Sequence, residues 1–277
     1  MKQVQGMVTK FIVILLAICW GNLAFANEGS HPAPQVAKWY KVYWSGIHVA
    51  DMIATVEDKK MDIMIDSYGI AKTLSKFSSK TRSTFVFKDG RYVPASYYSA
   101  FTQRRGDRSI DINYNTEGVI TSEVVNPPDK SWKRPPVEDD KKVGAYDPVT
   151  VFLAARNYLK MAHEAQKNYF SLPVYDGRRL SRIHFHIVGE QIIEVEDTKH
   201  DVVKVVVSRD QVAGFTKREM KRSKEEEPTI TFYFSNDEHF MPIKAFAQAP
   251  IGTAVMLLEK TCSSVADCTP YGMANLD

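Results

Sequence analysis

The chain lacks the short motifs by which the common enzyme classes are recognised. It contains no Gly-x-Ser-x-Gly sequence, no phosphate-binding loop and no dinucleotide-binding fingerprint. Its histidines, among them His48, His163 and His239, have no neighbouring Ser, Cys or Asp arranged as a nucleophile set. We therefore expect a protein that is not an enzyme and that needs no cofactor.

Long apolar runs are scarce, and the one near the start has the features of a targeting segment. Basic residues precede an apolar run at residues 11–17, and Ala24-Phe25-Ala26 fits a cleavage site. These features predict a secretory signal peptide over residues 1–26, cut after Ala26, and export to the periplasm. Lipidation of Cys19 is the alternative, and the bulky neighbours of that cysteine argue against it. No later stretch is long enough for a transmembrane helix, so residues 27–277 should carry no membrane anchor.

The mature chain also has little net charge and few cysteines. The formal charge of +3 falls to about +1 when the two lysines of the signal peptide are removed. A near-neutral chain argues against a nucleic-acid partner. Cleavage leaves Cys262 and Cys268, and in an oxidising compartment a pair with this spacing predicts a disulfide worth about 2 kcal/mol. A redox-active pair is the alternative, but the spacing is not Cys-x-x-Cys.

Most of the mature chain alternates apolar and polar residues in the manner of β-strands. We expect strands at 38–45, 47–56, 62–68, 83–88, 91–103, 109–114, 118–125, 182–188, 191–195, 202–207, 229–235, 239–247 and 253–259. Asp89-Gly90 is a strong hairpin signal. A short helix is expected at residues 70–77, and the densely charged residues 217–227 are expected to form a solvated loop or strand tip.

One long segment has a helical pattern instead, at about residues 148–168. Asp147 can cap its first turn with a carboxylate, and proline suits the first helical position. Phe152 and Leu159 lie two turns apart on an apolar stripe, whereas Arg156 and Lys160 lie off it. We expect this helix to plug the concave side of a sheet. No Gly/Ser-rich linker divides the chain, so residues 27–277 should form a single β-rich domain.

Four landmarks of the sequence carry a family resemblance. They are Tyr43-Trp44-Ser45-Gly46-Ile47, Asp147-Pro148-Val149-Thr150, Tyr175-Asp176-Gly177-Arg178 and Met241-Pro242-Ile243-Lys244. In this order they resemble a bacterial exported family described as domain of unknown function 3108, over nearly all the mature chain. The resemblance implies one long, strongly curved antiparallel sheet of the β-spiral or half-barrel kind, similar in shape to periplasmic lipoprotein carriers and envelope-integrity proteins. It implies no catalytic residues.

Charged turns are the candidate contact sites. Asp176, Arg178 and Arg179 could hold an acidic or phosphorylated group or a partner protein, because a guanidinium suits such partners. Arg104 and Arg105, in a hairpin tip that also holds Arg108, form a second cationic cluster. An ordinary charged surface turn is the favoured interpretation of both.

Two histidines are the candidate metal ligands. His184 and His186 share one face of a strand, which is a metal-ligand geometry, but the local sequence offers no third ligand. We therefore expect no bound metal.

These observations leave three hypotheses for function. The leading one is a non-enzymatic periplasmic cell-envelope protein that binds an apolar envelope ligand or a partner protein in or on its curved sheet. The second is an envelope scaffold whose interior is filled by its own side chains. The third and least favoured is a metal-assisted enzyme that uses His184 and His186.

Overall fold

The computed structural model of the protein describes residues 36–268 except 105, 227–228 and 250–251. The predicted signal peptide and Cys19 lie outside these residues. Within them, no helix has the length and apolar content needed to cross a bilayer.

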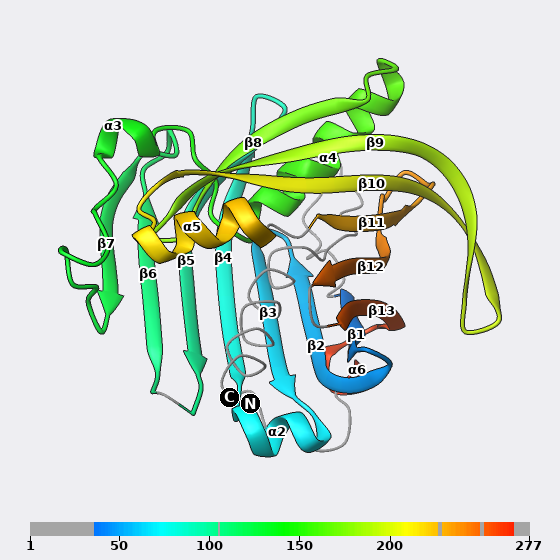
Figure 1. The fold of residues 1–277 in the computed structure, drawn as a ribbon. Coiled ribbons are helices and arrows are strands. Elements are labelled where there is room, and N and C mark those ends of the chain that lie inside the picture. Colours follow the sequence, from blue (N-terminus) through cyan, green and yellow to red (C-terminus); the bar gives the residue numbers. More distant parts are fainter. Residues whose placement is uncertain (1–35, 105, 227–228, 250–251, 269–277) are drawn as a thin grey trace.

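In the described residues thirteen strands form one antiparallel sheet, in the order β7-β6-β5-β4-β3-β2-β1-β13-β12-β11-β10-β9-β8 (Figure 1). The first seven are β1 (Val36–Trp44), β2 (Ile47–Glu57), β3 (Lys60–Ser67), β4 (Ser78–Lys88), β5 (Arg91–Thr102), β6 (Arg108–Tyr114) and β7 (Ile120–Asn126). The others are β8 (Tyr169–Tyr175), β9 (Leu180–Val195), β10 (Thr198–Ala213), β11 (Ile230–Ser235), β12 (Pro242–Ala249) and β13 (Gly252–Cys262). The helices are α2 (Gly69–Ser75), α3 (Asp139–Lys142), α4 (Thr150–Glu164), α5 (Lys217–Glu226) and α6 (Val265–Cys268).

The first and last strands in the sequence, β1 and β13, lie side by side inside the sheet. β1 pairs with β13, whereas β7 and β8 are the two edges, so the sheet is curved but not closed. The chain crosses from one edge to the other through residues 127–168, which contain α3 and α4. The predicted fold class is confirmed: a mainly-β protein with one long antiparallel sheet around a central helix.

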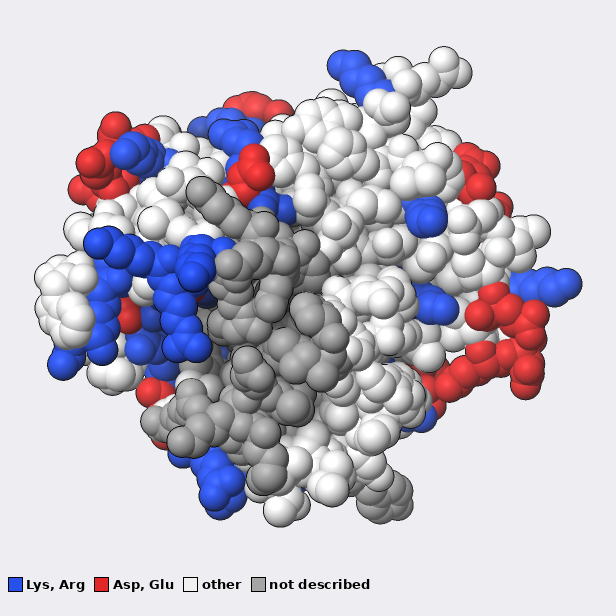
Figure 2. All heavy atoms as spheres, in the orientation of Figure 1, with Lys and Arg blue, Asp and Glu red and all other residues white. Residues whose placement is uncertain are grey.

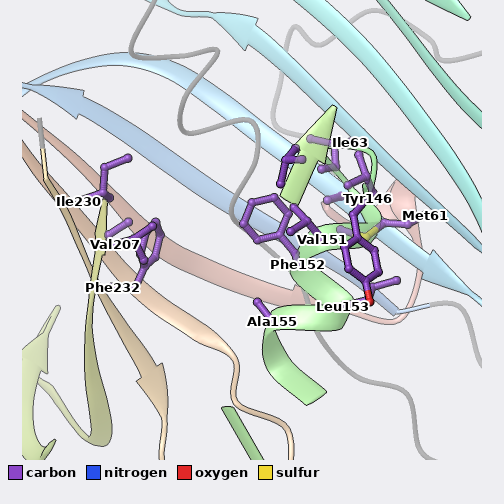
Figure 3. Close-up of a cluster of buried hydrophobic side chains, with 14 of the residues drawn as sticks. Met61, Ile63, Tyr146, Val151, Phe152, Leu153, Ala155, Val207, Ile230 and Phe232 are labelled. Atoms are coloured by element: carbon purple, nitrogen blue, oxygen red, sulfur yellow. The ribbon is translucent and has the colours of Figure 1, made fainter. Parts of the chain in front are cut away.

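Helix α4 fills the concave side of the sheet. Its apolar residues belong to one buried cluster with strands from both halves, and Figure 3 shows Phe152 between Ile63 of β3 and Phe232 of β11. Phe152 and Leu159 are both buried. Turns from both halves also hold the helix: Asn157 Nδ2 donates to Gly90 O at 2.8 Å, and Arg156 Nε donates to His239 O at 2.7 Å. The interior is therefore occupied by the chain's own side chains.

The burial of Arg156 differs from what was predicted. It was expected off the buried stripe together with Lys160, but its contact with the β11–β12 turn leaves it half-buried, and burial lowers the pKa of its guanidinium to about 10. Lys160 is exposed as expected.

A buried carboxylate fixes the start of α4. Asp147 is 0% exposed, and its Oδ1 accepts hydrogen bonds from the N–H groups of Val149 and Thr150 at 2.8 and 2.9 Å. Ser83 Oγ, on β4, donates to Asp147 Oδ2 at 3.0 Å. These bonds satisfy the free N–H groups of the first turn and attach it to the sheet. The helix begins at Thr150, two residues later than predicted.

The helix ends at Glu164, four residues before the predicted boundary. Gln166 adopts a left-handed conformation, with φ of 52°. The N–H of Lys167 then bonds to Ala162 O at 2.8 Å, and the N–H of Gln166 bonds to His163 O at 3.2 Å. This pair of bonds is the Schellman arrangement, which stops a helix. It was overlooked because the left-handed position holds glutamine rather than glycine.

The prediction for residues 217–227 was wrong, because residues 217–226 form helix α5. Thr216 and Glu219 cap its first turn reciprocally. Glu219 N donates to Thr216 Oγ1 at 3.2 Å, and Thr216 N donates to Glu219 Oε2 at 2.8 Å. This is a capping box, whose Thr-x-x-Glu signature stands in the sequence. The mixed charges that follow concealed it.

The runs at 182–188 and 191–195 are parts of one strand, β9, rather than two. Gly189 lies between them with φ of 141°, where the pairing with β10 shifts register. The glycine accommodates a bulge, so the strand continues.

We predict that Phe152→Ala is strongly destabilising. Truncation of a buried phenylalanine leaves a cavity and typically costs about 3 to 5 kcal/mol. Lys160→Ala, on the exposed face of the same helix, is the matched control and should cost about 0.5 kcal/mol or less. Urea denaturation of both variants measures the difference. Equal stabilities would mean that α4 does not fill the sheet.

Candidate functional site

The predicted cationic turn lies where the two edges of the sheet approach each other. Asp176, Arg178 and Arg179 occupy the β8–β9 turn. The guanidinium of Arg178 binds Asp129 through two hydrogen bonds, from Nε to Oδ2 and from Nη2 to Oδ1, the latter 2.7 Å long. Asp129 belongs to the segment that follows β7. These two hydrogen bonds therefore link the β8–β9 turn, at one edge of the sheet, to the segment that follows β7, at the other edge.

Arg108, Arg134 and Glu219 extend this contact. We term the full set the seam network: Arg108, Asp129, Arg134, Asp176, Arg178, Arg179 and Glu219. Arg134 Nη2 donates to Glu219 Oε1 on α5 at 2.9 Å, and Arg179 Nε donates to Asp176 Oδ2 at 2.8 Å. Arg108 Nη1, at the start of β6, lies 3.6 Å from Asp129 Oδ1. The network therefore joins β6, the segment after β7, the β8–β9 turn and α5.

Two glycines allow the turn to pack this closely. Gly177 has φ of +82°, and a Cβ there would lie 2.4 Å from Ile110 Cγ2 on β6. Gly214 has φ of +77°, and a Cβ there would lie 2.2 Å from the carbonyl oxygen of Arg178. Both positions require glycine for conformation and for space.

The charges of the seam network compensate one another. Burial would raise the pKa of Glu219, but hydrogen bonds from Arg134 and Thr216 and the charge of Arg179 lower it to about 2. For Asp129, burial is likewise outweighed by Arg178, Arg108 and Arg134, and its pKa is lowered. These arginines already bind carboxylates of the same chain. The arrangement therefore suits a structural link between the two edges of the sheet better than the binding of a free anion.

The second predicted cationic cluster, Arg104, Arg105 and Arg108, is divided between two places. The backbone N–H of Arg104 bonds to Ser75 O at 3.0 Å, which places this residue at the end of α2. Arg105 lies outside the described residues. Arg108, from the same hairpin tip, joins the seam network.

His184 belongs to a hydrogen-bonded chain with Tyr169 and Asp210. Its Nδ1 lies 2.7 Å from Tyr169 Oη and its Nε2 lies 2.9 Å from Asp210 Oδ2, while the ring of Tyr169 lies against His186. In the tautomer of His184 that carries its proton on Nε2, this nitrogen donates to the carboxylate and Nδ1 accepts from the tyrosine hydroxyl. The part of the chain that the structure describes holds no group of three metal-ligating side chains.

Cys262 and Cys268 form the predicted disulfide, with an S–S distance of 2.06 Å. The bond joins the end of β13 to α6. Both cysteines are buried with Ala37, Ile53 and Met64 in a cluster separate from the main core.

A groove of about 430 Å³ lies over strands β3 to β6. Its lining includes Asp66, Lys80, Asp107 and Arg108, together with several hydroxyl groups. The apolar residues Met64, Ala100 and Phe101 line the same groove.

Together the open sheet, the inserted helix and the seam network define a mainly-β protein built on one long antiparallel sheet. The chain belongs to the family of proteins of unknown function DUF3108, whose model matches residues 40–259. It is also similar to a β-barrel-like protein of domain of unknown function DUF1849 from Brucella abortus. The identity is 9%, the match covers 82% of this chain and 96% of that one, and the TM-score is 0.45. No curated protein matches the sequence.

We predict that the seam network makes the protein sensitive to acid. The pKa of Glu219 is lower in the folded chain, at about 2, than its ordinary value of 4.5. Its contribution to stability is therefore present above about pH 4.5 and is lost as the pH falls toward 2. Glu219→Gln should flatten the dependence of the unfolding free energy on pH across this window, as measured by urea denaturation. Glu194→Gln, at an exposed position on β9, is the control, and an equal effect there would refute the assignment.

Proposed function

We propose that the protein is an exported, non-enzymatic component of the cell envelope that binds a partner protein along the free edge of β7. The observation that carries this proposal is a filled interior combined with an unpaired edge strand. Export is supported by the signal-peptide pattern of residues 1–26 and by a disulfide that suits an oxidising compartment.

The filled interior favours binding on the outside of the sheet. The side chains that fill the concave side include Tyr40, Met52, Ile63, Leu153 and Phe232, all nearly inaccessible to solvent. An apolar ligand that took the place of α4 would expose Phe152 and Leu159 to water. Burial of each such side chain is worth about 1.5 to 3 kcal/mol, so this displacement is costly.

The two edges of the sheet differ in what they can offer a partner. Tyr146 covers part of β8: its N–H donates to Pro173 O at 3.0 Å, and the N–H of Tyr175 donates to Tyr146 O at 2.9 Å. β7 pairs with β6 alone within the described residues. An unpaired edge strand can take up an extended segment of another polypeptide through backbone hydrogen bonds.

Exposed apolar side chains accompany this edge. Val124 on β7 is exposed, and Trp132, in the segment that follows, is 76% exposed. Tryptophan is among the residues that contribute most to protein interfaces. β7 itself has one charged residue, Glu123, which is engaged by Tyr175 Oη and Lys142 Nζ at 3.0 Å each. The strand therefore lacks the outward charges that usually protect an edge.

The geometry of the polar clusters supports a role other than catalysis. The Tyr169–His184–Asp210 chain is the arrangement closest to a catalytic set, but the side chain of Asp210 is 73% exposed. Enzyme sites generally exclude water from such groups.

Photo-crosslinking in living cells tests the proposal. A photoreactive amino acid at position 124 or 132 should give one discrete protein adduct. The same probe at Val188, an exposed apolar position on β9, should not. Val124→Lys, combined with the probe at 132, should abolish the adduct, because a lysine on an edge strand opposes strand addition.

Two results would contradict the proposal. Equal crosslinking from positions 124 and 188 would show that β7 is not a specific surface. Native mass spectrometry of the purified protein that shows a bound lipid inside the sheet, without a partner protein, would favour the carrier hypothesis instead.

A further inference from the structure

Helix α2 exposes apolar side chains at one end of the molecule. Ile70 is 68% exposed, and Leu74, one turn further, is also exposed, whereas Ala71 and Ser75 face the sheet. In the sequence, Ile70, Leu74 and Phe77 recur at helical spacing. Only Phe77, which follows the helix, is buried. Ile70 and Leu74 are therefore both accessible to solvent.

Two neighbouring residues enlarge this surface, and we term Ile47, Tyr68, Ile70 and Leu74 the α2 patch. Tyr68 and Ile47 are both exposed. The N–H of Tyr68 donates to Val49 O at 2.7 Å, and its ring stacks on His48 with a centroid distance of 4.2 Å. These contacts hold the start of α2 against the start of β2, so the four side chains lie on one end of the sheet.

Three cationic residues lie on or beside α2. Lys72 and Lys76 are exposed on and just after the helix, and Arg104 is placed beside Ser75 by its backbone hydrogen bond. Burial raises the pKa of the Asp66 carboxyl on β3, and the positive charge of Lys72 opposes this rise. The lower end of the face in Figure 2, where Figure 1 places α2, shows mainly uncharged atoms with Lys or Arg beside them.

We propose that the α2 patch docks the protein on the surface of an anionic lipid bilayer. Exposed aliphatic and aromatic side chains on a short helix can enter the boundary between headgroups and acyl chains, and flanking lysines and arginines attract anionic headgroups. The charge complementarity selects a lipid surface over an apolar protein groove. α2 lies at the end of β3, away from β7 (Figure 1), so a docked molecule keeps its β7 edge accessible.

Co-sedimentation with vesicles tests this proposal on protein from which the signal peptide has been removed. The protein should bind vesicles that contain phosphatidylglycerol, and high salt should weaken this binding. Binding to pure phosphatidylcholine vesicles should be several-fold weaker. Ile70→Ser with Leu74→Ser should reduce binding to both kinds of vesicle. Lys72→Gln with Lys76→Gln should remove only the preference for the anionic lipid.

Ile192→Ser is the matched control, because Ile192 is as exposed as Ile70 but lies on the β9–β10 hairpin. It should bind like the unaltered protein. The proposal is overturned if the unaltered protein fails to bind phosphatidylglycerol vesicles, or if the control loses as much binding as the α2 variants. It is also overturned if crosslinking from position 70 gives a protein adduct while vesicle binding is absent. None of these outcomes depends on the β7 edge.

Discussion

The buried carboxylate of Asp147 is the contact on which the architecture depends. Its oxygens bind the first turn of α4 and Ser83 of β4, so one side chain places the helix inside the sheet. Burial raises the pKa of this carboxyl, and its hydrogen bonds with Thr150, Val149 and Ser83 oppose that rise. Such a group is tolerated inside a protein only when it is hydrogen-bonded. The helix that it anchors covers the apolar concave face, which would otherwise be open to water.

The unclosed sheet explains why the charged residues gather where they do. Edge strands β7 and β8 do not pair with each other, and side chains of the seam network and of Glu123 connect the two ends of the sheet. The backbone edge of β7 takes no part in these side-chain contacts, and the proposed contacts with a partner and a membrane both use outer surfaces. The β7 edge and the α2 patch lie on different parts of those surfaces, which would allow the protein to contact a partner and a membrane together.

Local patterns predicted much of the fold, because period-two alternation and turn chemistry are written in adjacent residues. Asp89-Gly90 forms a turn with positive φ at both residues, as its sequence indicates. Helix α5 was missed although its capping box is equally local, because a run of mixed charges is also typical of loops. The seam network could be predicted only in part. Asp129 and Glu219 are distant in sequence from Arg178 and Arg179, and nothing local indicates that they meet. The exposure of the apolar side chains of α2 could not be predicted either. Periodicity indicates which residues share an apolar face, but not which distant residues cover that face.

Native-state hydrogen exchange tests most directly whether α4 is the fixed centre of this protein. If the helix fills the sheet permanently, the amides of Leu153 to Leu159 should exchange only through global unfolding, with the same free energy as those in the centre of β4. Amides of α4 that exchange with a much smaller free energy than those of β4 would contradict the account. They would show that the helix leaves the sheet in the native state and that the interior can open to a ligand.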